Sequence, residues 1–129
     1  MTTCHSDMTE LAQEIADLYD YLKKPLDRTP EGLILELDSR GQWLARSAEL
    51  LADAQVLLDQ KRGKAAEVHI GTKESWNVVK HQIEAECVDE KKLFVLAERL
   101  NATLTHQMDG IRSILSFEKQ SMAQLRGVQ

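Results

Sequence analysis

The residues of this chain best suited to chemistry are a histidine, a glutamate and a cysteine in its second half. His81, Glu84 and Cys87 recur at intervals of three, so in a helix they lie on one face and could converge on a metal ion. The paired Glu-x-x-His motif of di-iron bundles is absent. We therefore favour solvated polar side chains beside a cysteine that packs as a small core residue. The sequence predicts no metal site and no cofactor.

Motifs typical of enzymes are missing from the sequence. It contains no glycine-flanked nucleophile, no glycine-rich phosphate loop and no dinucleotide fingerprint. Gly63 and Gly71 bracket a stretch with the composition of a turn. We predict that the protein is not an enzyme.

A basic cluster is the best candidate for a binding site. Lys61, Arg62 and Lys64 place three positive charges within four positions, and Lys73 follows soon after. Each subunit could neutralise a few phosphates of a nucleic acid, and a ring of subunits would multiply that weak contact. Trp76 could stack on unpaired bases. The alternative is a basic helix end that suits the helix dipole, with the tryptophan in the core.

The composition favours a helical bundle. Among 129 residues only two are Pro and six are Gly, and aromatic residues make up 5%, so the core must consist of Leu, Ile, Val and Ala. No apolar run approaches the roughly 18 residues that a membrane-spanning helix needs. Residues 1–10 are polar and acidic, unlike a signal peptide. We expect a cytoplasmic protein without membrane contact, in which Cys4 and Cys87 are free thiols.

Charge is distributed unevenly along the chain, whose net charge is −5. Residues 1–60 carry five Lys or Arg and twelve Asp or Glu, whereas residues 61–129 carry eleven and nine. An acidic half repels nucleic acid, so the chain is not typical of a dedicated duplex-DNA binder. A local phosphate-contacting patch in the second half remains compatible with this distribution.

Hydrophobic periodicity and helix-terminating residues divide the chain into helices of a single domain, residues 1–129. The first helix has a three-four apolar repeat and should end before Pro25. The second contains Gly41, which weakens it near residues 38–42. The last helical region could be one helix or two. The expected elements are a helix over residues 8–24, a helix over 31–67, a hairpin tip at 68–75 and a helical region over 76–125.

The most informative stretch, residues 89–125, can be interpreted as one nearly unbroken helix. At about 1.5 Å per residue it would be on the order of 55 Å long, more than the diameter of a compact domain of this size. Its apolar residues recur at alternating spacings of four and three and form a continuous seam. Such a seam needs partners, so we predict an elongated all-α helical hairpin or bundle that forms homo-oligomers. The predicted oligomer interface consists of Leu100, Leu104, Gln107, Ile111 and Ile114.

One polar residue, Gln107, lies on this seam. Buried polar groups on a seam fix register and oligomer state at some cost in stability. The substitution Gln107→Leu is therefore expected to raise thermal stability while loosening subunit number or register. The alternative is a solvated face with one tolerated glutamine.

Two stretches of the sequence resemble a known class of protein. They are residues 51–64, LADAQVLLDQKRGK, and residues 99–119, RLNATLTHQMDGIRSILSFEK. In its layout over residues 33–119 the chain resembles the UvsY-like recombination mediators of tailed phages. The second stretch also looks like a recurring signature of uncharacterised phage and mobile-element proteins. The resemblance implies an accessory that helps to load a recombinase on single-stranded DNA, with the basic cluster contacting phosphates and the seam assembling subunits.

Two functions fit these expectations. The first is a non-enzymatic, self-assembling protein of phage or prophage type that acts on single-stranded DNA beside recombination or replication proteins. The second is a structural or adaptor coiled-coil protein that binds other proteins and makes no DNA contact. Sedimentation with and without a single-stranded oligonucleotide distinguishes them.

Overall fold

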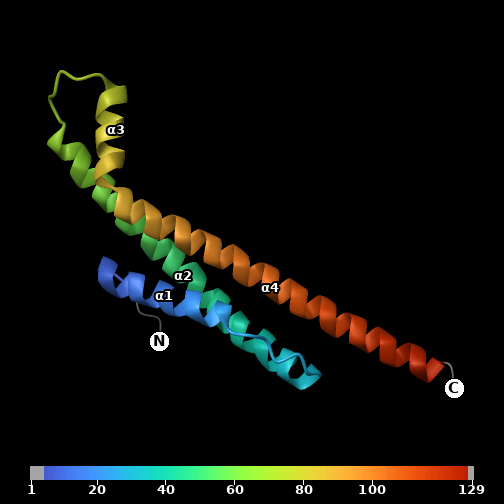
Figure 1. The fold of residues 1–129 in the computed structure, drawn as a ribbon. Helices are drawn as coiled ribbons and strands as arrows, with labels where there is room; N and C mark the ends of the chain where they lie inside the picture. The colour runs from blue at the N-terminus through green and yellow to red at the C-terminus, as the bar shows by residue number, and fades with distance from the viewer. Residues whose placement is uncertain (1–4, 128–129) are drawn as a thin grey trace.

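The computed structural model describes residues 5–127, which form four helices and no strand. The all-α prediction is confirmed. Figure 1 shows an elongated molecule in which two long helices run along each other and two shorter helices accompany them. The helices are α1 (Met8–Lys23), α2 (Pro30–Val68), α3 (Trp76–Glu86) and α4 (Val88–Gly127).

Local capping residues determine where α1 begins and ends. The Asp7 side chain accepts a hydrogen bond from the Thr9 amide at 2.9 Å, which satisfies a donor left free at the helix N-terminus. The helix ends where Lys24 adopts extended backbone. That conformation is expected of the residue that precedes Pro25, because the proline ring disfavours a helical neighbour.

The long helix α2 runs unbroken for 39 residues. Thr29 caps its start by accepting a hydrogen bond from the Gly32 amide at 3.0 Å, and Pro30 occupies the first helical position, where no N–H is needed. The expected weak point at Gly41 is helical. A Cβ atom added to Gly41 would lie 3.7 Å from the Met108 side chain, so packing against α4 supports the backbone there.

The hairpin tip is the loop between Val68, which ends α2, and Trp76, which begins α3. Within it Gly71 has a φ of 82°, a left-handed conformation that favours glycine. A second break separates α3 from α4 at Cys87, whose φ of −104° and ψ of 18° depart from helical geometry. The region from residue 76 to residue 125 therefore contains two helices.

The helices α2 and α4 form an antiparallel hairpin, and α1 packs against both. Two side-chain pairs show the direction, since Asn101 bonds Ser47 and Gln107 bonds Arg40, each at 2.9 Å. Residue numbers thus rise along α4 as they fall along α2. The core shared by α1, α2 and α4 consists of Leu11, Ile15, Leu18, Leu50, Ala54, Ala97, Leu100 and Leu104. A second cluster joins α2 to α3 and consists of Leu58, Ala65, Val79, Ile83 and Cys87.

A buried polar layer crosses the hairpin. Arg40, of which 2% is exposed, donates from Nε to Gln107 Oε1 at 2.9 Å and forms an ion pair with Glu36 of its own helix. Its Nη1 reaches the Tyr21 hydroxyl of α1 at 3.5 Å, and Gln107 Nε2 donates to the Leu22 carbonyl at 3.4 Å. A buried charge without partners is costly. Because sliding α4 along α2 would separate these groups, the layer fixes the register of the hairpin.

An ion pair also joins α1 to α2. Arg46 donates to both carboxylate oxygens of Glu14, at 2.7 and 2.9 Å, and to Glu49 at 2.8 Å. The hydrogen bonds to Glu14 are the main cause of the raised pKa of Arg46, and Glu49 adds to it. Bidentate pairs of this kind are directional, so the contact orients α1 on the hairpin.

Two further expectations concern membranes and thiols. In the described part of the chain, no helix has both the length and the apolar character needed to cross a membrane. Cys87 is a buried free thiol. Cys4, the other predicted free thiol, lies outside the described residues.

Candidate functional site

The candidate metal ligands have separate surroundings. His81 is exposed, Glu84 accepts hydrogen bonds from Arg62, and Cys87 is fully buried. Burial, followed by the charges of Glu90 and Glu84, raises the pKa of the Cys87 thiol, which disfavours the thiolate form that binds metals. Within residues 5–127 no group of three His, Cys, Asp or Glu side chains is placed to hold an ion.

The basic cluster lies near the C-terminal end of α2, and its members differ in their surroundings. Lys61 and Lys64 are exposed, as is Lys73 in the loop. Arg62 instead donates to Glu84 of α3, from Nε at 3.0 Å and from Nη2 at 3.3 Å. This bidentate pair holds α3 against α2. Of the four predicted phosphate contacts, the three lysines are accessible and the arginine already has a structural partner.

Trp76 lies at the surface of the tip. It is 68% exposed, so the alternative that places it in the core is wrong. Val68 and Ile70 are also exposed, by 73% and 78%. An open hollow of about 320 Å³ lies beside them, lined by Ala66, His69, Ile70, Thr72, Glu74, Trp76, Val79 and Ile83. Large apolar side chains gathered at a surface are a feature of interaction sites.

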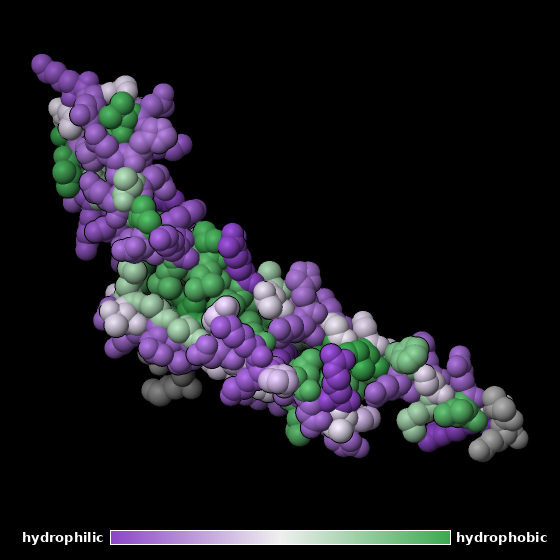
Figure 2. Space-filling model, in the orientation of Figure 1, coloured by the Kyte–Doolittle hydropathy of each residue, from purple (hydrophilic) through white to green (hydrophobic). Residues whose placement is uncertain are grey.

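From here on, the tip means residues 61–81, which include the end of α2, the loop and the start of α3. This region is basic, although the protein as a whole is acidic. Residues 61–81 contain five Lys or Arg, two His and only two Glu, whereas the whole chain has a net charge of −5. Lys80 and His81 of α3 are exposed there as well. In Figure 2 hydrophilic side chains cover most of the tip, with hydrophobic atoms among them. Many proteins that bind single-stranded nucleic acid combine positive charge with exposed aromatic rings.

The seam residues predicted to join subunits are occupied within the chain. Leu104 is 0% exposed, Leu100 5% and Ile111 1%, and the two leucines belong to the core shared with α1 and α2. Gln107 bonds Arg40, and Ile114 is half-buried. The seam is therefore covered by helices of the same chain, and its burial does not require a second copy.

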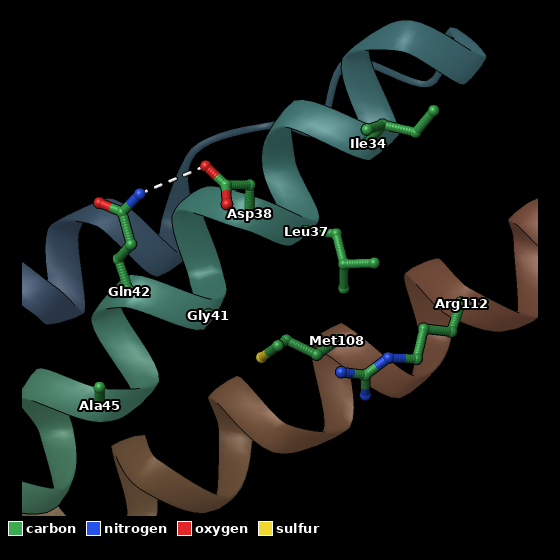
Figure 3. Close-up of a pocket in the computed structure, with 8 residues that line it drawn as sticks. All are labelled: Ile34, Leu37, Asp38, Gly41, Gln42, Ala45, Met108 and Arg112. Atoms are coloured by element: carbon green, nitrogen blue, oxygen red, sulfur yellow. Dashed lines mark hydrogen bonds between the residues drawn. The ribbon is translucent and has the colours of Figure 1, made fainter.

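A shallow groove of about 600 Å³ runs between α2 and α4. Figure 3 shows Leu37 of α2 and Met108 of α4 projecting into the space between the two helices. Its polar groups are paired on their own helices, Gln42 with Asp38 at 3.2 Å and Arg112 with Asp109 at 3.2 Å. The groove suits packing better than chemistry. Its lining consists of Ile34, Leu37, Asp38, Gly41, Gln42, Ala45, Met108 and Arg112.

The sequence indicates Gln107 as a polar residue of the seam but not its partner Arg40, although α2 contains a signal for it. Arg40 and Ser47 are seven positions apart and interrupt the leucines of α2 on the side that meets α4. Polar residues at heptad spacing on an apolar face indicate paired groups in the interface of the two helices.

No protein-family model, curated protein or solved structure matches this chain.

Proposed function

We propose that the protein is a non-enzymatic accessory that binds single-stranded DNA through its hairpin tip, in recombination or replication of the phage type. The observation that carries the proposal is Trp76, 68% exposed at the start of α3, directly after the loop that contains the exposed Lys73, while the exposed Lys61 and Lys64 lie in the last turns of α2, which packs against α3. The resemblance in layout to UvsY-like mediators supports the setting in recombination.

The geometry of the tip favours unpaired strands. A base stacked on an aromatic side chain contributes about 1–3 kcal/mol, and only an unpaired strand offers its base faces to Trp76. The lysines then neutralise neighbouring phosphates and release counterions. Because the rest of the chain is acidic, the strand is repelled elsewhere and held at the tip.

Fluorescence anisotropy with a labelled oligonucleotide tests the lysines. Changing all three to Gln should lower affinity and flatten the slope of log affinity against log salt by about 2, since each phosphate contact on a single strand contributes about 0.7. A control with the same loss of charge at exposed positions outside the tip should bind like the wild type. The test variant changes Lys61, Lys64 and Lys73, and the control changes Lys24, Arg28 and Lys92.

Tryptophan fluorescence tests the stacking contact directly. The chain has two Trp residues, so Trp43→Phe leaves Trp76 as the only reporter. Oligonucleotide should quench its emission. In the full chain Trp76→Ala should weaken binding roughly 5- to 150-fold, whereas Trp76→Phe should retain most of the affinity. Equal affinity of all three proteins would refute the stacking contact.

The adaptor function is the second candidate. Exposed Val68, Ile70 and Trp76 also suit an apolar surface of a protein partner. If the wild-type protein binds no oligonucleotide even at low salt, the DNA proposal is refuted and the adaptor function remains.

A further inference from the structure

The helix α4 extends past the start of α2. Continuing the register of the Ser47–Asn101 pair along the hairpin brings Pro30 level with Glu118, and these two residues line one hollow together with Met122 and Arg126. Residues 119–127 of α4 extend past the first residue of α2, which borders them only through the hollow at Pro30, as the projecting end of α4 in Figure 1 shows. We call residues 119–127 the overhang.

The side of α4 that faces α2 continues along the overhang. Leu115, Glu118, Met122 and Leu125 maintain the three-four spacing of the seam. Met122 is 57% exposed and Leu125 71%. Figure 2 shows hydrophobic side chains recurring towards the C-terminal end of α4. A helix face with this spacing is suited to packing against another helix.

Two charges on this face have no partner along their own helix. Glu118 has no Lys or Arg three or four positions away, and Arg126 has no Asp or Glu three or four positions before it. The Oε2 atom of Glu118 is buried and has no hydrogen-bond partner among the described residues. This oxygen is covered by the chain itself, but Glu118 as a whole is only half-buried and Arg126 is exposed, so both side chains can meet an opposite charge on another molecule.

We propose that the overhang is a self-association surface on which two copies pair antiparallel about a twofold axis at Met122. Glu118 and Arg126 lie four positions on either side of Met122, about 6 Å along the helix in each direction. Antiparallel pairing brings each Glu118 level with Arg126 of the second copy, so that opposite charges meet at both ends of the contact. A twofold interface must be self-complementary, and this charge arrangement identifies the occupant as a second copy of the chain.

The contact is small, and the dimer is correspondingly weak. The overhang spans about 13 Å. The surface area that two copies bury there is therefore at the low end for specific protein–protein interfaces. We expect a monomer–dimer equilibrium that depends on protein concentration. The surface is at the opposite end of α4 from the tip (Figure 1), so the inference does not depend on DNA binding.

Charge reversal tests both the surface and its register by sedimentation velocity over a concentration series. Glu118→Arg alone places two cations together in each contact, and Arg126→Glu alone places two anions together, so each variant should be monomeric. An equimolar mixture of the two should form dimers, because both contacts then join opposite charges. Single variants that dimerise like the wild type, or a mixture that stays monomeric, would overturn the proposal.

Cross-linking provides a second test that does not rely on the charged residues. In the proposed dimer the two Met122 residues face each other at the twofold axis. Where two helices pack 8–10 Å apart, the Cα atoms of such a facing pair lie within about 7 Å of each other. With Cys4 changed to Ser, Met122→Cys should form a disulfide-linked dimer when diamide oxidises the two thiols. Gln120→Cys, exposed on a different side of α4, is the matched control. Equal cross-linking at both positions would refute the twofold arrangement.

Discussion

Replacing Gln107 by Leu tests the buried polar layer, and the structure reverses the effect expected from the sequence. The seam pattern alone predicts higher thermal stability, because an apolar side chain would replace a polar one. In the structure Gln107 Oε1 accepts a hydrogen bond from Arg40 Nε at 2.9 Å, and Arg40 is 2% exposed. Leucine would leave an N–H of a buried guanidinium without an acceptor.

The size of the effect follows from these contacts. A hydrogen bond to a charged group contributes about 1.5–3 kcal/mol. The contacts of Arg40 with Glu36 and Tyr21 remain, and burial of the leucine recovers about 1 kcal/mol. We expect the free energy of unfolding to fall by about 0.5–2 kcal/mol. For 129 residues this corresponds to a Tm lower by about 2–7 °C.

Urea denaturation and thermal melting, both followed by circular dichroism, measure this change. The matched control is Gln120→Leu, an exposed position on α4, which should alter stability by less than about 0.5 kcal/mol. The double variant Arg40→Met with Gln107→Leu should lose less than the sum of the single losses, because no buried charge is left unpaired. A Gln107→Leu protein as stable as the wild type would refute the reasoning.

Three further predictions concern single positions. Gly110→Ala should raise the free energy of unfolding by about 0.5–1 kcal/mol in urea titration, because an added Cβ meets no atom within 4 Å; a loss would contradict this. Carbon-13 NMR titration should find the pKa of Asp27 below its ordinary value, because the Thr29 amide and then its hydroxyl donate to the carboxylate. Stability from this group is present above the ordinary pKa and is lost as pH falls through the lowered one. Gly32→Ala should raise that pKa again, since the new Cβ would collide with the carboxylate; an unchanged titration would count against these contacts. Cys87, whose pKa burial raises, should react slowly with a thiol reagent in the folded protein and rapidly in denaturant, with the other cysteine changed to serine; rapid reaction of the folded protein would show that the thiol is accessible.

The sequence predicts the ends of a helix where residues within a few positions determine them. The end of α1 before Pro25 and the start of α2 at Thr29 and Pro30 depend on groups within a few residues. The break at Cys87 could not be predicted in this way, because its neighbours include neither Gly nor Pro. Cys87 packs with Leu58 of α2 and with residues of α3, so the break accompanies a tertiary contact that periodicity does not reveal.

The sequence predicts where the basic cluster lies along the chain, but not which of its side chains already have a partner in the fold. Spacing of charge alone locates the basic cluster, but the pairing of Arg62 with Glu84 joins residues 22 positions apart. Whether Trp76 is buried or exposed cannot be inferred from periodicity, because both cases have the same spacing. The seam shows the same limit. Its period indicates a buried face, whereas only the fold shows that α1 and α2 cover it.

The length of α4 has a consequence for how strands of different length would bind. With 40 residues, α4 spans about 60 Å between the end near the tip and the overhang. A dimer joined at the overhangs is a bivalent rod with one tip at each far end. A short oligonucleotide engages one tip only, whereas a strand that reaches both gains avidity from its effective concentration at the second tip. If the protein both dimerises at the overhangs and binds single-stranded DNA at the tip, affinity should rise at the strand length that bridges the two tips.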